Sequence, residues 1–75
     1  MTEEAITKLG FEKVHPEKPN YYYFKKVGNI EFTTNARNEV LDGSWYTDLF
    51  ESGIRFHSST ELKTVIDLLE YNKIF

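Results

Sequence analysis

The sequence predicts an α+β fold: an antiparallel β-meander of about four strands, with a short N-terminal helix and an amphipathic C-terminal helix packed on one face. Short runs rich in β-branched and aromatic residues alternate with turns that contain Gly, which is typical of strands joined by tight turns. Strands joined in this way must be antiparallel. Near the C-terminus the apolar residues recur at helical spacing instead. A sheet with helices on one face is an α+β layer arrangement.

The chain has 75 residues and no cysteine, so we expect a single domain over residues 1–75 without a disulfide or a thiolate metal site. Small domains often gain stability from disulfides or metals. Here the stability must come instead from burial of aromatic side chains, of which there are six Phe, five Tyr and one Trp. The N-terminus is acidic and no apolar run approaches the roughly 20 residues that span a bilayer. We therefore expect a cytoplasmic protein that makes no membrane contact.

The first expected element is a helix that begins after Thr2, which suits the N-cap. Glu3 and Glu4 then occupy the first turn, where negative charge favours the helix dipole. Gly10 is a natural C-terminal stop. The short apolar stripe consists of Ala5, Ile6 and Leu9.

A short strand over residues 11–14 and a proline-containing loop precede the strongest strand signal, residues 21–27. Gly28-Asn29 suits a two-residue type II′ turn that leads into a partner strand over residues 30–34. This turn places Val27 opposite Ile30, and one face of the hairpin then carries Tyr21, Tyr23, Lys25, Val27, Ile30 and Phe32. The opposite face carries Tyr22, Phe24, Lys26, Glu31 and Thr33. The first face is the better core, but a three-residue turn would exchange the faces of one strand, so the choice stays open.

Residues 35–39 are polar and are expected to form a loop, and Asp42-Gly43 is a second hairpin signal. Residues 45–50 and 54–56 are expected to be strands, separated by a turn in which Gly53 takes the left-handed conformation. The number of strands between residues 35 and 57 stays open at this point.

The last helix has the clearest pattern. Ser58 and Glu61 match the capping box that opens a helix. The helix should run to about Tyr71. Its apolar face, at spacings of three and four residues, consists of Leu62, Val65, Ile66 and Leu69.

Three segments together resemble small phage and prophage proteins of Gram-positive bacteria. They are the helix end Lys8-Leu9-Gly10-Phe11, the tyrosine-rich strand, and the closing helix over residues 60–70. The resemblance implies an accessory role, such as one in phage–host conflict, in which a small protein binds a larger host or phage protein. It transfers no site residues, because many such proteins have no assigned function.

No pattern of residues indicates catalysis or a metal site. His15 and His57 have no second His or Cys nearby in the sequence. Ser58 adjoins His57, but helix capping explains it without a catalytic role. No glycine-rich phosphate loop occurs. We therefore expect a protein that is not an enzyme and that uses no cofactor or metal.

The aromatic strand is the candidate binding site, because Tyr and Phe side chains alternate onto both of its faces and only one face can meet the helices. Tyr22 and Phe24, flanked by Lys26 and Glu31, are predicted to contact a protein partner. A second interpretation involves no binding function: a small sheet leaves Tyr at its margin, where the hydroxyl stays hydrated. A third interpretation is a platform for single-stranded nucleic acid. The net charge of −3 disfavours that last class.

The C-terminal residues form a second candidate contact. Leu68, Tyr71, Ile74 and Phe75 exceed what one helix face needs, so a homodimer or tail contact through Tyr71, Ile74 and Phe75 is plausible. The favoured function is a small, non-enzymatic, protein-binding module of an accessory or inhibitor-like kind, for which the resemblance implies a phage origin.

Overall fold

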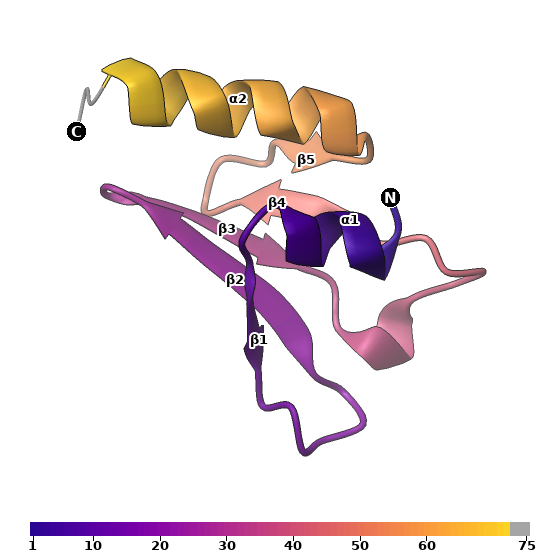
Figure 1. Ribbon diagram of the computed structural model, residues 1–75. Coiled ribbons are helices and arrows are strands. Elements are labelled where there is room, and N and C mark those ends of the chain that lie inside the picture. Colours follow the sequence, from indigo (N-terminus) through magenta and orange to yellow (C-terminus); the bar gives the residue numbers. More distant parts are fainter. Residues whose placement is uncertain (73–75) are drawn as a thin grey trace.

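The structure, a computed structural model, describes residues 1–72, with Asn72 described by its backbone alone. In chain order the elements are α1 (Glu3–Lys8), β1 (Glu12–Val14), β2 (Tyr22–Val27), β3 (Ile30–Thr34), a 3₁₀ turn (Arg37–Glu39), β4 (Thr47–Leu49), β5 (Arg55–Phe56) and α2 (Ser59–Asn72) (Figure 1). The strands form one antiparallel sheet in the order β1-β2-β3-β4-β5. The α+β meander is therefore confirmed. Within residues 1–72, no helix is both long enough and apolar enough to cross a bilayer.

The sheet has five strands where about four were predicted, because the short segments at both edges pair after all. One expected strand is shorter than predicted: residues 45–50 contribute only Thr47–Leu49. The backbone of Trp45 pairs with Met1 instead of a strand, with N–O distances of 2.9 Å in both directions. The Tyr46 amide donates to the Asn35 side chain at 3.0 Å. These two contacts end the ladder early.

The hairpin between β2 and β3 has the predicted register, with Val27 opposite Ile30 and Lys25 opposite Phe32. Gly28 has a φ of 62°, as the first central residue of a type II′ turn requires. The register decides which face is buried. Tyr23, Val27 and Phe32 point into the core, at 5%, 5% and 0% exposure.

The segment between β3 and β4 departs from the expected loop in two places. Arg37–Glu39 form a 3₁₀ turn, because the Glu39 carboxylate accepts a hydrogen bond from the Ala36 amide at 2.9 Å and closes the turn. Asp42 and Gly43 do form a tight turn, with φ of 54° and 70°. A single bridge flanks it, Leu41 to Ser44, so this turn is a projecting tip and not a hairpin between two strands.

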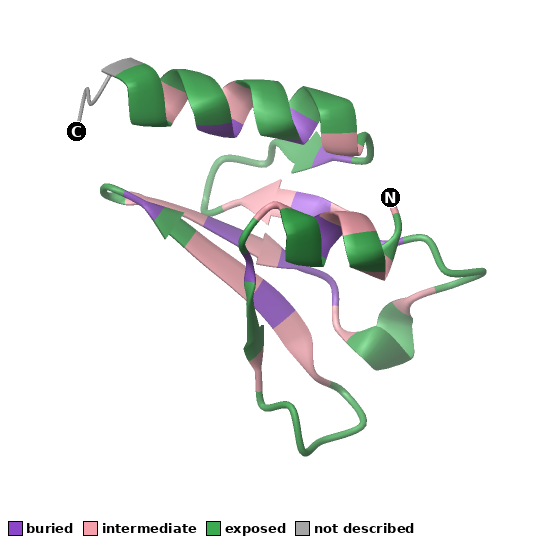
Figure 2. Ribbon diagram, viewed as in Figure 1, coloured by how far each residue is buried: buried purple, intermediate pink, exposed green. Residues whose placement is uncertain are grey.

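Both helices lie on the same side of the sheet, and the core fills the space between them and the strands (Figures 1 and 2). α2 contributes Leu62 and Ile66, at 0% and 3% exposure, while Val65 and Leu69 are partly buried against the same cluster. The Ser58 hydroxyl accepts a hydrogen bond from the Glu61 amide at 3.3 Å, as predicted for the helix cap. The buried apolar side chains are Ile6, Phe11, Tyr23, Val27, Phe32, Trp45, Phe56, Leu62 and Ile66.

α1 is held at both ends. Thr2 caps it by accepting the Ala5 amide at 3.1 Å, and Gly10 follows with a φ of 87°. Lys25, on the core-facing side of β2, is only partly buried. Its ammonium reaches the end of α1, 3.3 Å from where a β carbon on Gly10 would lie. A lysine is tolerated there because its stem covers apolar surface while its charge stays near water.

Candidate functional site

The side of the sheet away from the helices is uncovered, and we call it the open face. Strand alternation decides its members. The pairing register aligns one residue of each strand in a row across the sheet: Glu12, Phe24, Thr33, Asp48 and Arg55. The neighbouring positions on the same face are Val14, Tyr22, Lys26, Glu31 and Phe50.

The four residues predicted as the binding site, Tyr22, Phe24, Lys26 and Glu31, all lie on the open face. Tyr22, Phe24 and Glu31 are partly buried and Lys26 is exposed. The Tyr22 ring meets His15 edge-on, with 6.3 Å between ring centroids. Lys26 and Glu31 are directly opposite one another on β2 and β3. The structure thus brings the predicted set together on one surface.

Other residues of this surface were not predicted. Arg55 binds Asp48 through two hydrogen bonds, Nε to Oδ1 at 2.7 Å and Nη2 to Oδ2 at 3.3 Å. The Arg55 guanidinium also lies 3.9 Å from the centre of the Tyr46 ring. Phe50, which directly follows β4, is 59% exposed. Alternation along residues 45–50 was a usable signal for Asp48 and Phe50, whereas the Arg55 contacts required the pairing of β4 with β5.

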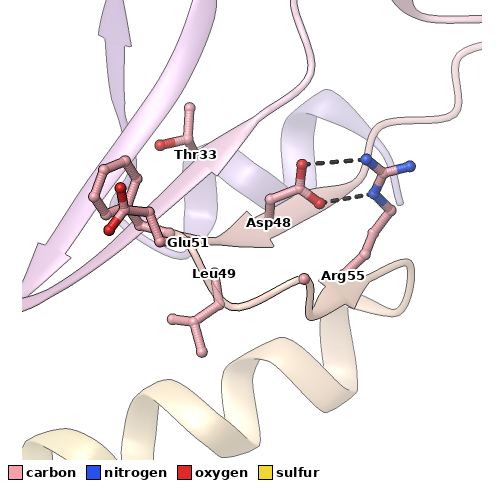
Figure 3. Close-up of a pocket in the computed structure, with 7 residues that line it drawn as sticks. Thr33, Asp48, Leu49, Glu51 and Arg55 are labelled. Carbon is pink, nitrogen blue, oxygen red and sulfur yellow. Dashed lines mark hydrogen bonds and ion pairs between the residues drawn. The ribbon is translucent and has the colours of Figure 1, made fainter.

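Two shallow hollows lie beside Phe50. The larger has a volume of about 450 Å³ and is lined by Thr33, Asp48, Leu49, Phe50, Glu51, Gly53 and Arg55. In Figure 3, Asp48 and Arg55 are hydrogen-bonded to each other on one side of this hollow, and Glu51 lies on the other side. The Leu49 side chain points toward α2. The smaller, of about 210 Å³, is lined by Asn29, Ile30, Glu31, Leu49, Phe50 and Ser52.

The open face and its adjoining β4–β5 turn carry more negative than positive charge. The carboxylates are Glu12, Glu31, Asp48 and Glu51, and the cations are Lys26 and Arg55. Arg55 is already paired with Asp48. A surface of this kind repels phosphate and attracts basic groups.

The hydrogen bonds to Asp48 raise the pKa of Arg55 on the open face, and the other displaced pKa values belong to a cluster on the other side of the sheet. The hydroxyls of Tyr21 and Tyr23 both donate to Oε2 of Glu3, at 2.8 and 2.6 Å. The hydrogen bond from Tyr23 lowers the pKa of Glu3, helped by the one from Tyr21. Burial and the bond to Glu3 raise the pKa of Tyr23 to about 12, and the bond to Glu3 raises that of Tyr21. The group ties α1 to β2, which is a structural role.

The remaining candidate residues give weaker support for a binding site than the open face does. Tyr71, near the end of α2, is 86% exposed. Ile74 and Phe75 lie outside the described residues, so the tail contact stays a prediction. The His57 ring lies 6.0 Å from the Tyr46 ring. Within residues 1–72, no three His, Cys, Asp or Glu side chains come together as metal ligands would.

No protein-family model, curated protein or solved structure matches this chain. What the molecule does is therefore inferred from the geometry of the open face.

Proposed function

We propose that the protein is a small, non-enzymatic module that binds another protein through its open face, in an accessory or inhibitor-like role. One observation carries the proposal. The helices cover a single face of the five-stranded sheet, and the uncovered face presents Tyr22, Phe24 and Phe50. Aromatic anchors surrounded by polar groups often supply most of the binding energy of a protein interface.

The polar surroundings of these rings fit an interface. Lys26 and Glu31 flank Phe24 along β2 and β3. The pair of Asp48 and Arg55 lies in the same cross-strand row as Phe24, on β4 and β5. Such groups contribute little affinity themselves but exclude wrong partners and fix the orientation of the right one. Phe24 also lines a third hollow, of about 230 Å³, with Gly10, Glu12, Lys25 and Lys26.

The resemblance to phage and prophage proteins would make the partner a host or phage protein, met in the cytoplasm. Single-stranded nucleic acid is a weaker candidate ligand. Nucleic-acid binding draws much of its affinity from cations that neutralise phosphates. The carboxylates of the open face outnumber its cations, which opposes that mechanism.

The test begins with the immobilised protein and a lysate of a Gram-positive bacterium, followed by identification of the retained proteins. The dissociation constant of the retained partner is then measured by calorimetry. Tyr22→Ala plus Phe24→Ala should abolish binding, because two central anchors are removed at once. The fold should survive, since cross-strand pairs contribute only about 0.2–1 kcal/mol each.

The controls separate folding from binding. Tyr22→Thr plus Phe24→Thr keeps residues that favour strands, and guards against a double Ala variant that fails to fold. Tyr71→Ala removes an exposed aromatic from α2 and should leave binding unchanged. Binding that is lost with Tyr71→Ala but kept in the double variants would move the contact to the tail. Binding of a mixed oligonucleotide without any protein partner would replace the proposal with the nucleic-acid function.

A further inference from the structure

Phe50 is an exposed aromatic residue that borders two hollows. Its amide donates to the Glu31 carbonyl at 3.0 Å, so the residue continues the pairing of β4 with β3. Alternation from Asp48 then places the ring on the open face. The ring is 59% exposed and borders hollows of about 450 and 210 Å³. A group from a partner can therefore lie against it.

The charged groups that line the two hollows are negative except Arg55, whose charge is paired with Asp48. Glu51 lines the larger hollow and Glu31 lines the smaller one. Neither carboxylate makes an ion pair within residues 1–72. Asp48, by contrast, has both oxygens bonded to Arg55. The larger hollow thus combines an exposed aromatic ring with one available carboxylate.

A basic side chain satisfies both features. The face of an aromatic ring attracts a cation, and a carboxylate accepts charge-assisted hydrogen bonds from guanidinium or ammonium groups. We propose that the hollow between Phe50 and Glu51 takes a Lys or Arg side chain of the partner protein. This inference rests on the proposed protein-binding function and adds the chemistry of the partner. The net charge of −3 favours the approach of a basic segment for the same reason.

The direct test uses an acetylated, amidated hexaarginine peptide as the probe, titrated into the ¹⁵N-labelled protein at about 0.15 M salt, where exposed charges are largely screened beyond about 8 Å. The amide signals of Thr33, Phe50 and Glu51 should move most. Phe50→Leu should weaken binding by about 2- to 30-fold, which is the range of a cation–π contact. Phe50→Tyr keeps the ring and should retain binding.

Glu51→Gln should weaken peptide binding, whereas the charge-matched control Glu70→Gln, on the exposed side of α2, should not. The inference would be overturned by equal affinity in both Gln variants, by shifts spread evenly over the molecule, or by the same shifts with a hexaglutamate peptide. Shifts that grow with protein concentration alone would identify a second copy as the occupant and would also overturn it.

The captured partner separates this inference from the function on which it rests. If the partner is lost with the Tyr22 and Phe24 double variant but retained equally by Phe50→Leu and Glu51→Gln, the protein-binding function stands and the basic side chain is wrong. If all of these variants retain the partner, both proposals are wrong. Loss with each of them supports both.

Discussion

At the scale of single residues, Glu3 determines how α1 meets the sheet. Its carboxylate accepts hydrogen bonds from Tyr21 and Tyr23 at 2.8 and 2.6 Å, and the Tyr21 ring stacks on Trp45 with 6.1 Å between centroids. α1 has only six residues, too few to be stable alone in water. Its position therefore depends on these side-chain contacts and on the burial of Ile6.

We predict that Glu3→Gln destabilises the protein by about 1–3 kcal/mol, because the hydrogen bonds to a charged acceptor are weakened. Glu4→Gln is the matched control, since the Glu4 side chain is 77% exposed and its ion pair among residues 1–72 is with Lys8, one turn along the helix. That change should stay within about 0.5 kcal/mol. Urea unfolding at neutral pH measures both, and equal effects of the two variants would contradict the structural role of Glu3.

The same residue predicts a pH dependence. A carboxyl whose pKa is lowered by folding stabilises the protein above its ordinary value of 4.5, and this contribution is lost as the pH falls through the lowered pKa. The difference between wild type and Glu3→Gln should therefore shrink in acid. At the alkaline end, the pKa of Tyr23 is raised from 10.0 to about 12, so its contribution is present below 10 and lost as the pH rises through 12. Unfolding curves across both ranges test these signs.

At the scale of elements, α2 shows how a helical stripe divides between core and margin. Leu62 is fully buried, whereas Leu69, two turns later, is only partly buried against the same cluster. The sheet beneath the helix ends in β5, which has two residues. The later turns of α2 therefore have less of the sheet to cover them.

We predict that Leu62→Ala costs about 2–5 kcal/mol, because it leaves a cavity in a closed core. Leu69→Ala should cost less, about 1–2 kcal/mol, since water already reaches the site. Glu70→Ala, on the exposed side of the helix, serves as the control. Thermal unfolding of the three variants gives the ranking, and a Leu69 variant as unstable as the Leu62 variant would contradict the observed burial.

At the scale of the whole molecule, stability should concentrate in the middle of the sheet. β3 has a paired strand on each side, and its residue Phe32 is completely buried. β1 and β5 are edge strands of three and two residues. Short edges open locally more easily than a central strand does.

Native-state hydrogen exchange should therefore show the amides of β3 exchanging only through global unfolding, and those of β1 and β5 exchanging at lower free energy. Glu3→Gln should lower the protection of α1 more than a uniform loss of stability would. Equal protection of β1 and β3 would show instead that the sheet opens as one unit.

Local chemistry in the sequence was enough to predict the order of elements, the cap at Ser58, and the register set by Gly28-Asn29. Each depends on residues within a few positions of one another, where turn geometry and side-chain capping act. The same register predicted that Tyr22, Phe24, Lys26 and Glu31 share a face. The sequence alone left open which face would be buried, because the turn type decides it.

Only the tertiary structure decided the features that join distant parts of the chain. The pairing of Met1 with Trp45 shortened β4, and the pairing of β4 with β5 brought Arg55 onto Asp48. The hydrogen bonds from Tyr21 and Tyr23 to Glu3 likewise join residues about twenty positions apart in the sequence. The physical reason is that periodicity fixes which side of an element is apolar, whereas the partner that covers that side is chosen when the whole core packs.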